Sequence, residues 1–187
     1  MESHWVVEDA VRDILQCIGE DPSRPGLIET PARFAIACKQ WFGGYEMRPE
    51  EILKVFDDGG ETYDQMITVK DIPIYSMCEH HITPIFGIAT ISYIPNGRIV
   101  GLSKLSRLAD MYARRLQVQE RMTEQIADAL FTHVKPLGVG VLIKARHLCM
   151  ESRGVCQQGH CTITTALKGI MADDASSKAE FLKMAGI

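Results

Sequence analysis

Residues 66–94 read MITVKDIPIYSMCEHHITPIFGIATISYI, and this stretch contains the pattern that decides the fold. Its two ends, residues 66–77 and 86–94, are rich in β-branched and aromatic side chains that partly alternate with polar ones. This composition and a period of two favour two β-strands. The tetrapeptide CEHH at residues 78–81 lies between them and precedes Pro84, so it is expected at a strand end.

Downstream of this stretch the pattern changes from strand to helix. The dipeptide Asn96-Gly97, just before Ile99, is typical of a tight hairpin turn. Ser103 can cap a helix that we expect to run through about Arg115. A second helix is expected over residues 119–134, which carry apolar side chains at fourfold spacing, namely Met122, Ile126 and Leu130.

Two further strands are expected near the C-terminus, over residues 139–146 and 161–167. From residue 66 onward the order is therefore two strands, two helices and two strands. This order predicts an α+β fold in which an antiparallel sheet carries helices on one face. The open edges of such a sheet need to be covered, so we expect an oligomer.

The N-terminal part of the chain is expected to be helical. Residues 5–18 have the spacing of an amphipathic helix. A second helix is expected to begin at Thr30, a good N-cap, with Pro31 in its first turn, and to end near Trp41. Pro49 is expected to open a short third helix.

The acidic, glycine-rich residues 57–63 are expected to form a loop. On this basis we divide the chain into an N-terminal helical arm at residues 1–55 and one functional domain at residues 56–187.

The composition excludes several classes of protein. Hydrophobic residues make up 46% and charged residues 24%, with a net charge of −4, so no basic excess is present to hold a nucleic acid. An anionic ligand would need a local cluster of arginines and lysines.

No apolar run approaches the ~20 residues that cross a bilayer, and no secretion signal is recognisable, so we expect a cytoplasmic protein. The six cysteines are then reduced thiols, some of them possible metal ligands.

Two clusters combine cysteine with histidine at expected strand ends. The first is CEHH at residues 78–81, in which a thiolate and an imidazole can share one zinc ion. The second is His147-Leu148-Cys149, directly after the strand at 139–146. In an extended chain, residues i and i+2 point to the same side, so His147 and Cys149 are expected to face one site.

Together the two clusters offer more ligands than an open metal site uses. Cys78, Cys149 and one histidine would give three protein ligands, the pattern of catalytic zinc sites, which keep a position open. Two histidines would remain for proton transfer. The spacing does not tell whether His80 or His81 is the ligand. A buried cysteine beside two incidental histidines is the plainer alternative for CEHH alone.

Charged and polar residues elsewhere could recognise a nucleotide. Lys104 and Arg107 lie three residues apart on one helix face near Ser103, at a helix start that favours anions, and Arg153 follows the second cluster. Ordinary solvated surface charge is the alternative. The pair Gln119-Glu120 starts the second helix, and a glutamate can accept two hydrogen bonds from the edge of a guanine. An acidic residue at a helix start is also common without any ligand.

A last group, Cys156, His160 and Cys161, could form a separate metal site with Cys149. Small buried hydrophobic residues are the more ordinary role of the cysteines at 156 and 161.

Five segments in sequence order resemble the GTP cyclohydrolase I family: SMCEHH at 76–81, YIPNG at 93–97, GLSKLSR at 101–107, RRLQVQER at 114–121 and HLCMESRG at 147–154. The resemblance extends over roughly residues 6–185. It departs at residues 156–161, CQQGHC, where the family usually has small or basic residues. That departure affects the local loop and one expected phosphate contact.

The resemblance implies a tunnelling fold, in which two-strand, two-helix, two-strand units join their sheets into a ring. It also implies a homodecamer whose active sites are shared between neighbouring copies. The implied reaction is hydrolytic opening of the GTP purine ring at C8, which releases formate and forms 7,8-dihydroneopterin triphosphate. This is the first step of folate or pterin biosynthesis.

The family's functional residues are carried over only at matching positions. The implied zinc ligands are Cys78, His81 and Cys149, and the implied acid–base residues are His80 and His147, with Ser103 assisting. Glu120, with help from Gln119, would hold the guanine edge. Four residues would hold the triphosphate or lie beside it, namely Ser103, Lys104, Arg107 and Arg153.

Two other interpretations of the sequence remain open at this point. One is another tunnelling-fold enzyme that acts on a pterin or a deazapurine. The other is a non-enzymatic zinc module, in which Cys156 or Cys161 would complete a closed four-ligand site.

Overall fold

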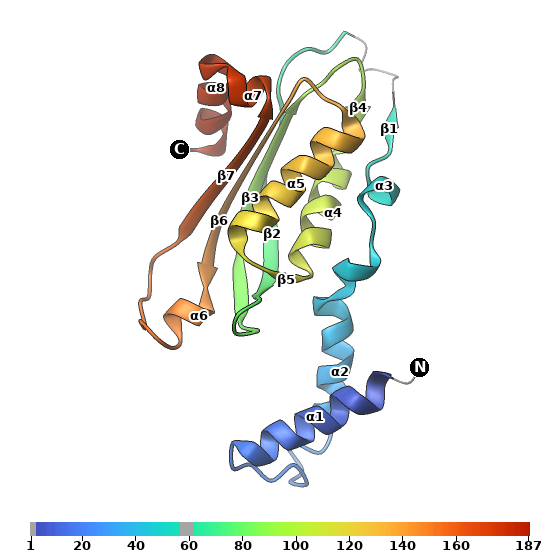
Figure 1. Cartoon of the computed structure of the whole chain (residues 1–187), viewed down its shortest axis with the longest axis vertical. Coiled ribbons are helices and arrows are strands. Elements are labelled where there is room, and N and C mark those ends of the chain that lie inside the picture. Colours follow the sequence, from blue (N-terminus) through green and yellow to red (C-terminus); the bar gives the residue numbers. More distant parts are fainter. Residues whose placement is uncertain (1–2, 57–61) are drawn as a thin grey trace. The chain divides into compact units, whose positions relative to one another are not determined.

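The computed structural model describes residues 3–56 and 62–187, and its contacts divide the chain into two compact units with a boundary between Gly43 and Gly44 (Figure 1). Most of the loop expected at residues 57–63 lies outside the described residues.

The first unit contains two helices, α1 (Ser3–Cys17) and α2 (Thr30–Trp41), close to their predicted positions. The cap predicted for α2 was wrong by one residue: Glu29 takes the N-cap position, without a capping side-chain bond. The preceding chain already runs in tight turns, with the Thr30 amide donating to the Leu27 carbonyl at 2.9 Å. The chain therefore enters the helix before Thr30 can act as a cap. Pro31 stands in the first turn, as predicted.

The second unit is built on a five-stranded sheet in the order β5-β2-β3-β6-β7. Its four long strands are β2 (Ile67–Cys78), β3 (Pro84–Ile94), β6 (Gly138–His147) and β7 (Thr162–Gly169). These four pair antiparallel, which confirms the predicted sheet. The short β5 (Leu116–Gln117) was not predicted and pairs parallel with the end of β2.

The strand register brings two sequence clusters to the same end of the sheet. Met77 of β2 pairs with Pro84 of β3, and the next residue of β3, Ile85, pairs with His147 of β6. The last residues of β2 and β6 therefore lie at one end of the sheet. At the opposite end, Ile67 pairs with Tyr93.

Helices α4 (Leu102–Ala113) and α5 (Gln119–Val134) cover one face of this sheet (Figure 1). The predicted fourfold apolar spacing is confirmed, because Met122, Ile126 and Leu130 are fully buried. Alternate residues of the central strands, such as Ile143 and Ala145, are buried beneath the helices. Burial of large apolar side chains of this kind contributes about 1.5–3 kcal/mol each.

The predicted hairpin at Asn96-Gly97 was wrong. Gly97 has a left-handed φ of 70°, but β4 (Ile99–Val100) pairs with β1 (Val55–Phe56) instead of turning back on β3. The reason is that β3 already pairs with β2 on one edge and with β6 on the other. No free edge of β3 therefore remains to pair with β4. The predicted Ser103 cap was also wrong, since Gly101 holds the N-cap position and Ser103 is within α4.

The remaining elements are short or lie at the C-terminus. A 3-10 helix η1 (Gly43–Glu46) precedes α3 (Pro49–Ile52), the short helix predicted at Pro49. Two helices that were not predicted, α7 (Ile170–Asp173) and α8 (Ala175–Ala185), follow β7. Phe181 of α8 is fully buried against Leu142 and Met171, in a second apolar cluster.

Candidate active site

The turn after β2 gathers the first cluster around Cys78. The Cys78 amide donates to the Thr83 carbonyl, and the Ile82 amide donates to the Cys78 carbonyl, both at 2.8 Å. Ile82 is held at a φ of 51°, a conformation that β-branched residues rarely adopt. The turn places the Nδ1 atoms of His80 and His81 at 4.0 and 3.8 Å from the Cys78 sulfur.

Cys149 reaches the same place from the other side of the site. The expectation of an extended chain from His147 to Cys149 was wrong, because β6 ends at His147 and Leu148–Glu151 form a helical turn, α6. That turn still brings the thiol to the first cluster. The ligand atoms of Cys78, His81 and Cys149 all lie within 4.8 Å of one another.

The three side chains fit a tetrahedral metal ion. Ligands at the usual zinc distances of about 2.0–2.3 Å would lie about 3.5–3.8 Å apart, so only a small contraction is needed. Burial and the neighbouring Cys78 raise the pKa of the Cys149 thiol above its ordinary value, a cost that a cation between the sulfurs would remove. The buried Thr83 hydroxyl, which has no hydrogen-bond partner among the described residues, lies close enough to lower that pKa. It is suited to donate to a ligating thiolate.

His147, at the end of β6, faces the start of α5. Its Nε2 atom lies 2.7 Å from the side-chain oxygen of Gln119. Burial lowers the pKa of His147 below its ordinary value, and the nearby Glu120 carboxylate opposes this shift. Gln119 is itself buried, whereas Glu120 beside it is exposed.

These groups line one pocket with a volume of about 250 Å³. Its walls are formed by Cys78, His80, Ile85, Gln117, Val118, Gln119, Glu120, His147, Cys149, Met150 and Thr162. Pockets for drug-sized ligands usually have about 300–1,000 Å³, so this one suits a single heterocycle better than a complete nucleoside triphosphate. The pocket therefore joins the two cysteines of the metal group, two further histidines and one carboxylate around a space of that size.

Arg153 is the one predicted cation that lies at this end of the sheet. Its Nη1 atom donates to Nε2 of His81 at 2.7 Å. The guanidinium thus adjoins the metal group.

The comparison with known families decides the classification. The family model described as GTP cyclohydrolase I matches residues 7–186. The chain belongs to the GTP cyclohydrolase I family.

Several curated relatives carry the family name. GTP cyclohydrolase 1 of Janthinobacterium sp. (strain Marseille) is 56% identical, covering 93% of this chain and 88% of the relative. The protein of that name from Nitrosospira multiformis is 54% identical, covering 92% and 90%. That from Thermobifida fusca is 50% identical, covering 95% and 86%. Among solved structures, the apo archaeosine synthase QueF-Like aligns with 56% of this chain and 93% of its own, with a TM-score of 0.47 and 19% identity.

The two-strand, two-helix, two-strand unit of the tunnelling fold, implied by the resemblance to the GTP cyclohydrolase I family, is confirmed for the single chain, and helices precede it in the sequence. Within residues 3–56 and 62–187, no helix combines the length and the apolar character needed to cross a bilayer.

Three residues that the family resemblance assigns to the phosphates do not reach the pocket. Ser103, Lys104 and Arg107 lie on the first half of α4, whose other end leads into β5 beside Cys78. A helix of 12 residues is about 18 Å long, so the start of α4 is at the opposite end of the sheet from Cys78 (Figure 1). One copy of the chain therefore does not assemble all the predicted site residues.

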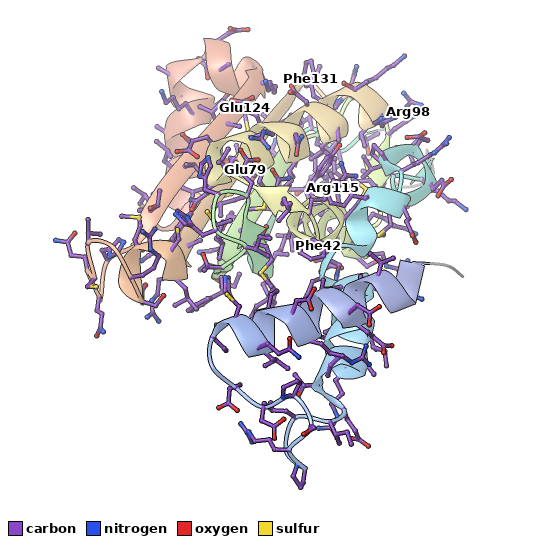
Figure 2. All side chains as sticks on the ribbon, turned by 60° about the horizontal axis from the view of Figure 1, so that its bottom comes forward. Phe42, Glu79, Arg98, Arg115, Glu124 and Phe131 are labelled. Atoms are coloured by element: carbon purple, nitrogen blue, oxygen red, sulfur yellow. The ribbon has the colours of Figure 1, made fainter. Side chains whose placement is uncertain are left out.

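Sequence reasoning missed an ion pair that braces the CEHH turn in this family member. Arg121 of α5 donates to both carboxylate oxygens of Glu79, at 2.6 and 2.9 Å, and Glu79 is labelled in Figure 2. These bonds lower the pKa of Glu79. The two residues are 42 positions apart, so no local spacing could have indicated the contact. The pair ties the metal turn to the helix that carries Glu120.

The loop that departs from the family pattern stays outside the metal group. Cys156 and Cys161 are exposed thiols, and within the described part of the chain only Cys78, His81 and Cys149 form a possible metal-binding group of three. Both ring nitrogens of His160 are buried and have no hydrogen-bond partner among the described residues.

Proposed function

We propose that this protein is a GTP cyclohydrolase that opens the purine ring of GTP at C8, releases formate and forms 7,8-dihydroneopterin triphosphate. The observation that carries the proposal is one pocket lined by Cys78, Cys149, His80, His147 and Glu120, with His81 close to the two cysteines in a possible metal-binding group. The family match over residues 7–186 supports this reaction over the two other interpretations of the sequence.

The metal that we propose is zinc, held by Cys78, His81 and Cys149. Two thiolates and one imidazole are ligands that zinc prefers, and three protein ligands leave a fourth position open. Zinc in such a site supplies Lewis acidity to whatever occupies that position. The group of three contains His81 and not His80, which supports His81 as the ligand.

The remaining histidines are proposed to move protons. His147 donates a proton to N7 of the guanine, which makes C8 more electrophilic. Its lowered pKa, caused by burial, makes its protonated form a stronger acid. His80 carries protons in the later steps that open and rearrange the ribose, with assistance from Ser103, which a neighbouring copy would contribute. Both histidines line the pocket.

Glu120 is proposed to hold the guanine. It stands on the first turn of α5, is exposed and lines the pocket, so its two oxygens can accept from N1–H and the exocyclic amino group. The resemblance pairs Gln119 with this role, but the side-chain amide of Gln119 is hydrogen-bonded to β6 and to His147.

Lys104, Arg107 and Arg153 are proposed to hold the triphosphate, with Ser103 beside them. Neither Lys104 nor Arg107 forms an ion pair within the residues that the structure describes, so both are available to an anion. Their distance from Cys78 supports a site completed by a neighbouring copy. We propose a ring-shaped homodecamer, in which other copies cover the outer edge of β7 and the part of β2 that β5 leaves unpaired.

Two broader predictions accompany this proposal. We assign catalysis to residues 56–187, because every proposed site residue lies there, and regard residues 1–55 as a helical arm. We also propose that the enzyme works in the cytoplasm, where unpaired cysteine thiols such as Cys78 and Cys149 stay reduced.

The test is incubation of the purified, metal-loaded protein with GTP. We expect one formate for each pterin, the pterin being measured by fluorescence after oxidation. Metal-stripped protein should release neither product. Guanosine should turn over more slowly than GTP, because it lacks the phosphate contacts that position the base. Metal-loaded protein that leaves GTP intact would disprove the proposed function.

A further inference from the structure

Gln119 is a buried polar residue whose side-chain nitrogen and oxygen both have hydrogen-bond partners. Its side chain is 1% exposed, between the start of α5 and strands β6 and β7. The amide nitrogen lies 3.0 Å from the Ile143 carbonyl oxygen, 3.1 Å from the Thr162 carbonyl oxygen and 3.0 Å from the Thr164 hydroxyl. Backbone carbonyls only accept hydrogen bonds, so the nitrogen, and not the oxygen, must face them.

This orientation decides the protonation pattern of His147. With the nitrogen toward the strands, the Gln119 side-chain oxygen faces Nε2 of His147 at 2.7 Å. An amide oxygen only accepts, so Nε2 must carry a hydrogen. The other ring nitrogen, Nδ1, is then the atom of His147 that remains to exchange a proton with a substrate.

Two threonines make this orientation rigid. The Thr123 hydroxyl donates to the Gln119 backbone carbonyl at 2.7 Å, and it also lies 2.7 Å from the Thr164 hydroxyl. Because the Thr123 hydrogen is used, Thr164 must donate to Thr123 and accept from Gln119. The hydrogen bonds therefore run in one direction around a closed ring, and a flip of the Gln119 amide would break it.

The same arrangement leaves Gln119 without a free group for a guanine. The two hydrogens of its amide face three acceptors, and its oxygen accepts from His147. A contact with the base would require breaking buried hydrogen bonds and leaving their buried donors or acceptors unpaired, which is unfavourable.

We infer that Gln119 is a positioning residue, which holds His147 with its hydrogen on Nε2 and thereby reserves Nδ1 for proton transfer to the substrate. The inference rests on the proposed function, since it assigns a task to the histidine that this function uses. It also revises the substrate-binding role that the sequence resemblance implied for Gln119.

The first test replaces Gln119 by methionine, which has a similar length but no amide. We expect kcat for formate release to fall roughly 10- to 100-fold, part of the full contribution of a general acid. The KM for GTP and the zinc content should stay within about twofold of wild type, because Gln119 touches neither. A rise in KM at unchanged kcat would instead favour a guanine contact and overturn the inference.

A double-mutant cycle separates positioning from a general structural effect. If Gln119 acts only through His147, then Gln119→Met should cause no further loss in a His147→Ala background. If the two substitutions each lower kcat by their own factor and these factors multiply in the double variant, the inference is overturned. The second variant is Thr164→Val, in which valine has nearly the same shape as threonine. It breaks the closed ring of hydrogen bonds but keeps the bond between Gln119 and His147. It should lower kcat only a few-fold, and a loss as large as that of Gln119→Met would contradict a role through His147.

A spectroscopic measurement distinguishes failure of this inference from failure of the proposed function. The ¹⁵N spectrum of histidine-labelled protein should show His147 protonated at Nε2 in the wild type and a mixture of tautomers in Gln119→Met. This readout needs no turnover. If wild-type protein leaves GTP intact, the proposed function fails, while an unchanged spectrum in Gln119→Met overturns the inference whatever the activity.

Discussion

The two ends of the sheet in one copy of the chain differ in how their functional side chains are held. At the end where β2 and β6 finish, Cys78, Cys149 and His147 are buried or half-buried and lie close together. At the other end, the side chains of Lys104 and Arg107 extend from α4 without an ion pair among the described residues. One chain organises the first end, whereas the second end carries cations for which the described part of that chain supplies no ion-pair partner.

This difference is the one expected if, as we propose, one chain carries two halves of two different sites. The metal half needs exact geometry, and strand register and a tight turn within one fold supply it. The phosphate half needs only charge on a stable helix, which another copy can present. Variants at the metal end should therefore lose zinc or proton transfer, whereas variants at the other end should lose affinity for GTP.

The largest effect is expected from the metal half. Cys78→Ala and Cys149→Ala should each lose zinc and all activity, because two remaining ligands do not hold the ion. Lys104→Ala serves as the control from the other end and should keep its zinc. Elemental analysis of the purified proteins measures this, and full zinc content in either cysteine variant would reject the ligand assignment.

The proton-transfer histidines should lose activity but keep the metal. We expect His80→Ser and His147→Ser to bind zinc and to lose roughly 10²- to 10⁴-fold in pterin formation. His147→Ser should release no formate, since N7 is not protonated, whereas His80→Ser should accumulate an opened purine. Zinc content, formate and pterin are measured for each variant. Loss of zinc in His80→Ser, with retention in His81→Ser, would reverse the assignment within the pair.

Substitutions in the phosphate half should weaken the binding of GTP. Lys104→Ala and Arg107→Ala each remove a charge-assisted hydrogen bond of about 1.5–3 kcal/mol, so the KM for GTP should rise roughly 10- to 100-fold. Zinc content should not change, and the two variants should act on guanosine almost like wild type. Steady-state kinetics with GTP and guanosine measure the difference. An equal loss with both substrates would speak against phosphate binding.

Mixing the two kinds of defect should restore activity if sites are shared. Chains with Cys149→Ala and chains with Lys104→Ala and Arg107→Ala are each expected to be inactive or weak. When they are unfolded together and reassembled, about a quarter of the sites should combine two intact halves, since each half is drawn from either chain. Activity near a quarter of wild type supports shared sites, and no gain over the separate proteins would refute them.

The smallest effect is expected from the loop after the second cluster. Cys156→Ser and Cys161→Ser change exposed thiols outside the metal group, so zinc content and turnover should remain near wild type, and stability should change by less than about 0.5 kcal/mol. Elemental analysis and thermal unfolding check this. Zinc loss in either variant would revive the closed four-ligand site that the sequence left open.

Patterns within one element were enough to predict most of the fold. The fourfold spacing of Met122, Ile126 and Leu130 identified α5, and β-branched residues identified the strands, because burial of one face leaves a local period in the sequence. The composition of the two Cys–His clusters likewise indicated a shared metal. Where the prediction of an element failed, at Asn96-Gly97, the turn signal was present but the neighbouring strand edge was already occupied.

The tertiary structure decided what depends on distance between elements. It grouped His81, and not His80, with Cys149, and it brought Cys149 there through a helical turn where an extended chain was expected. It also joined Glu79 to Arg121 and turned the amide of Gln119 toward His147. None of these contacts leaves a local period, because each depends on strand register and helix packing across 28 or more residues of chain. Sequence alone therefore determined which chemistry this protein carries, and packing determined which atoms meet.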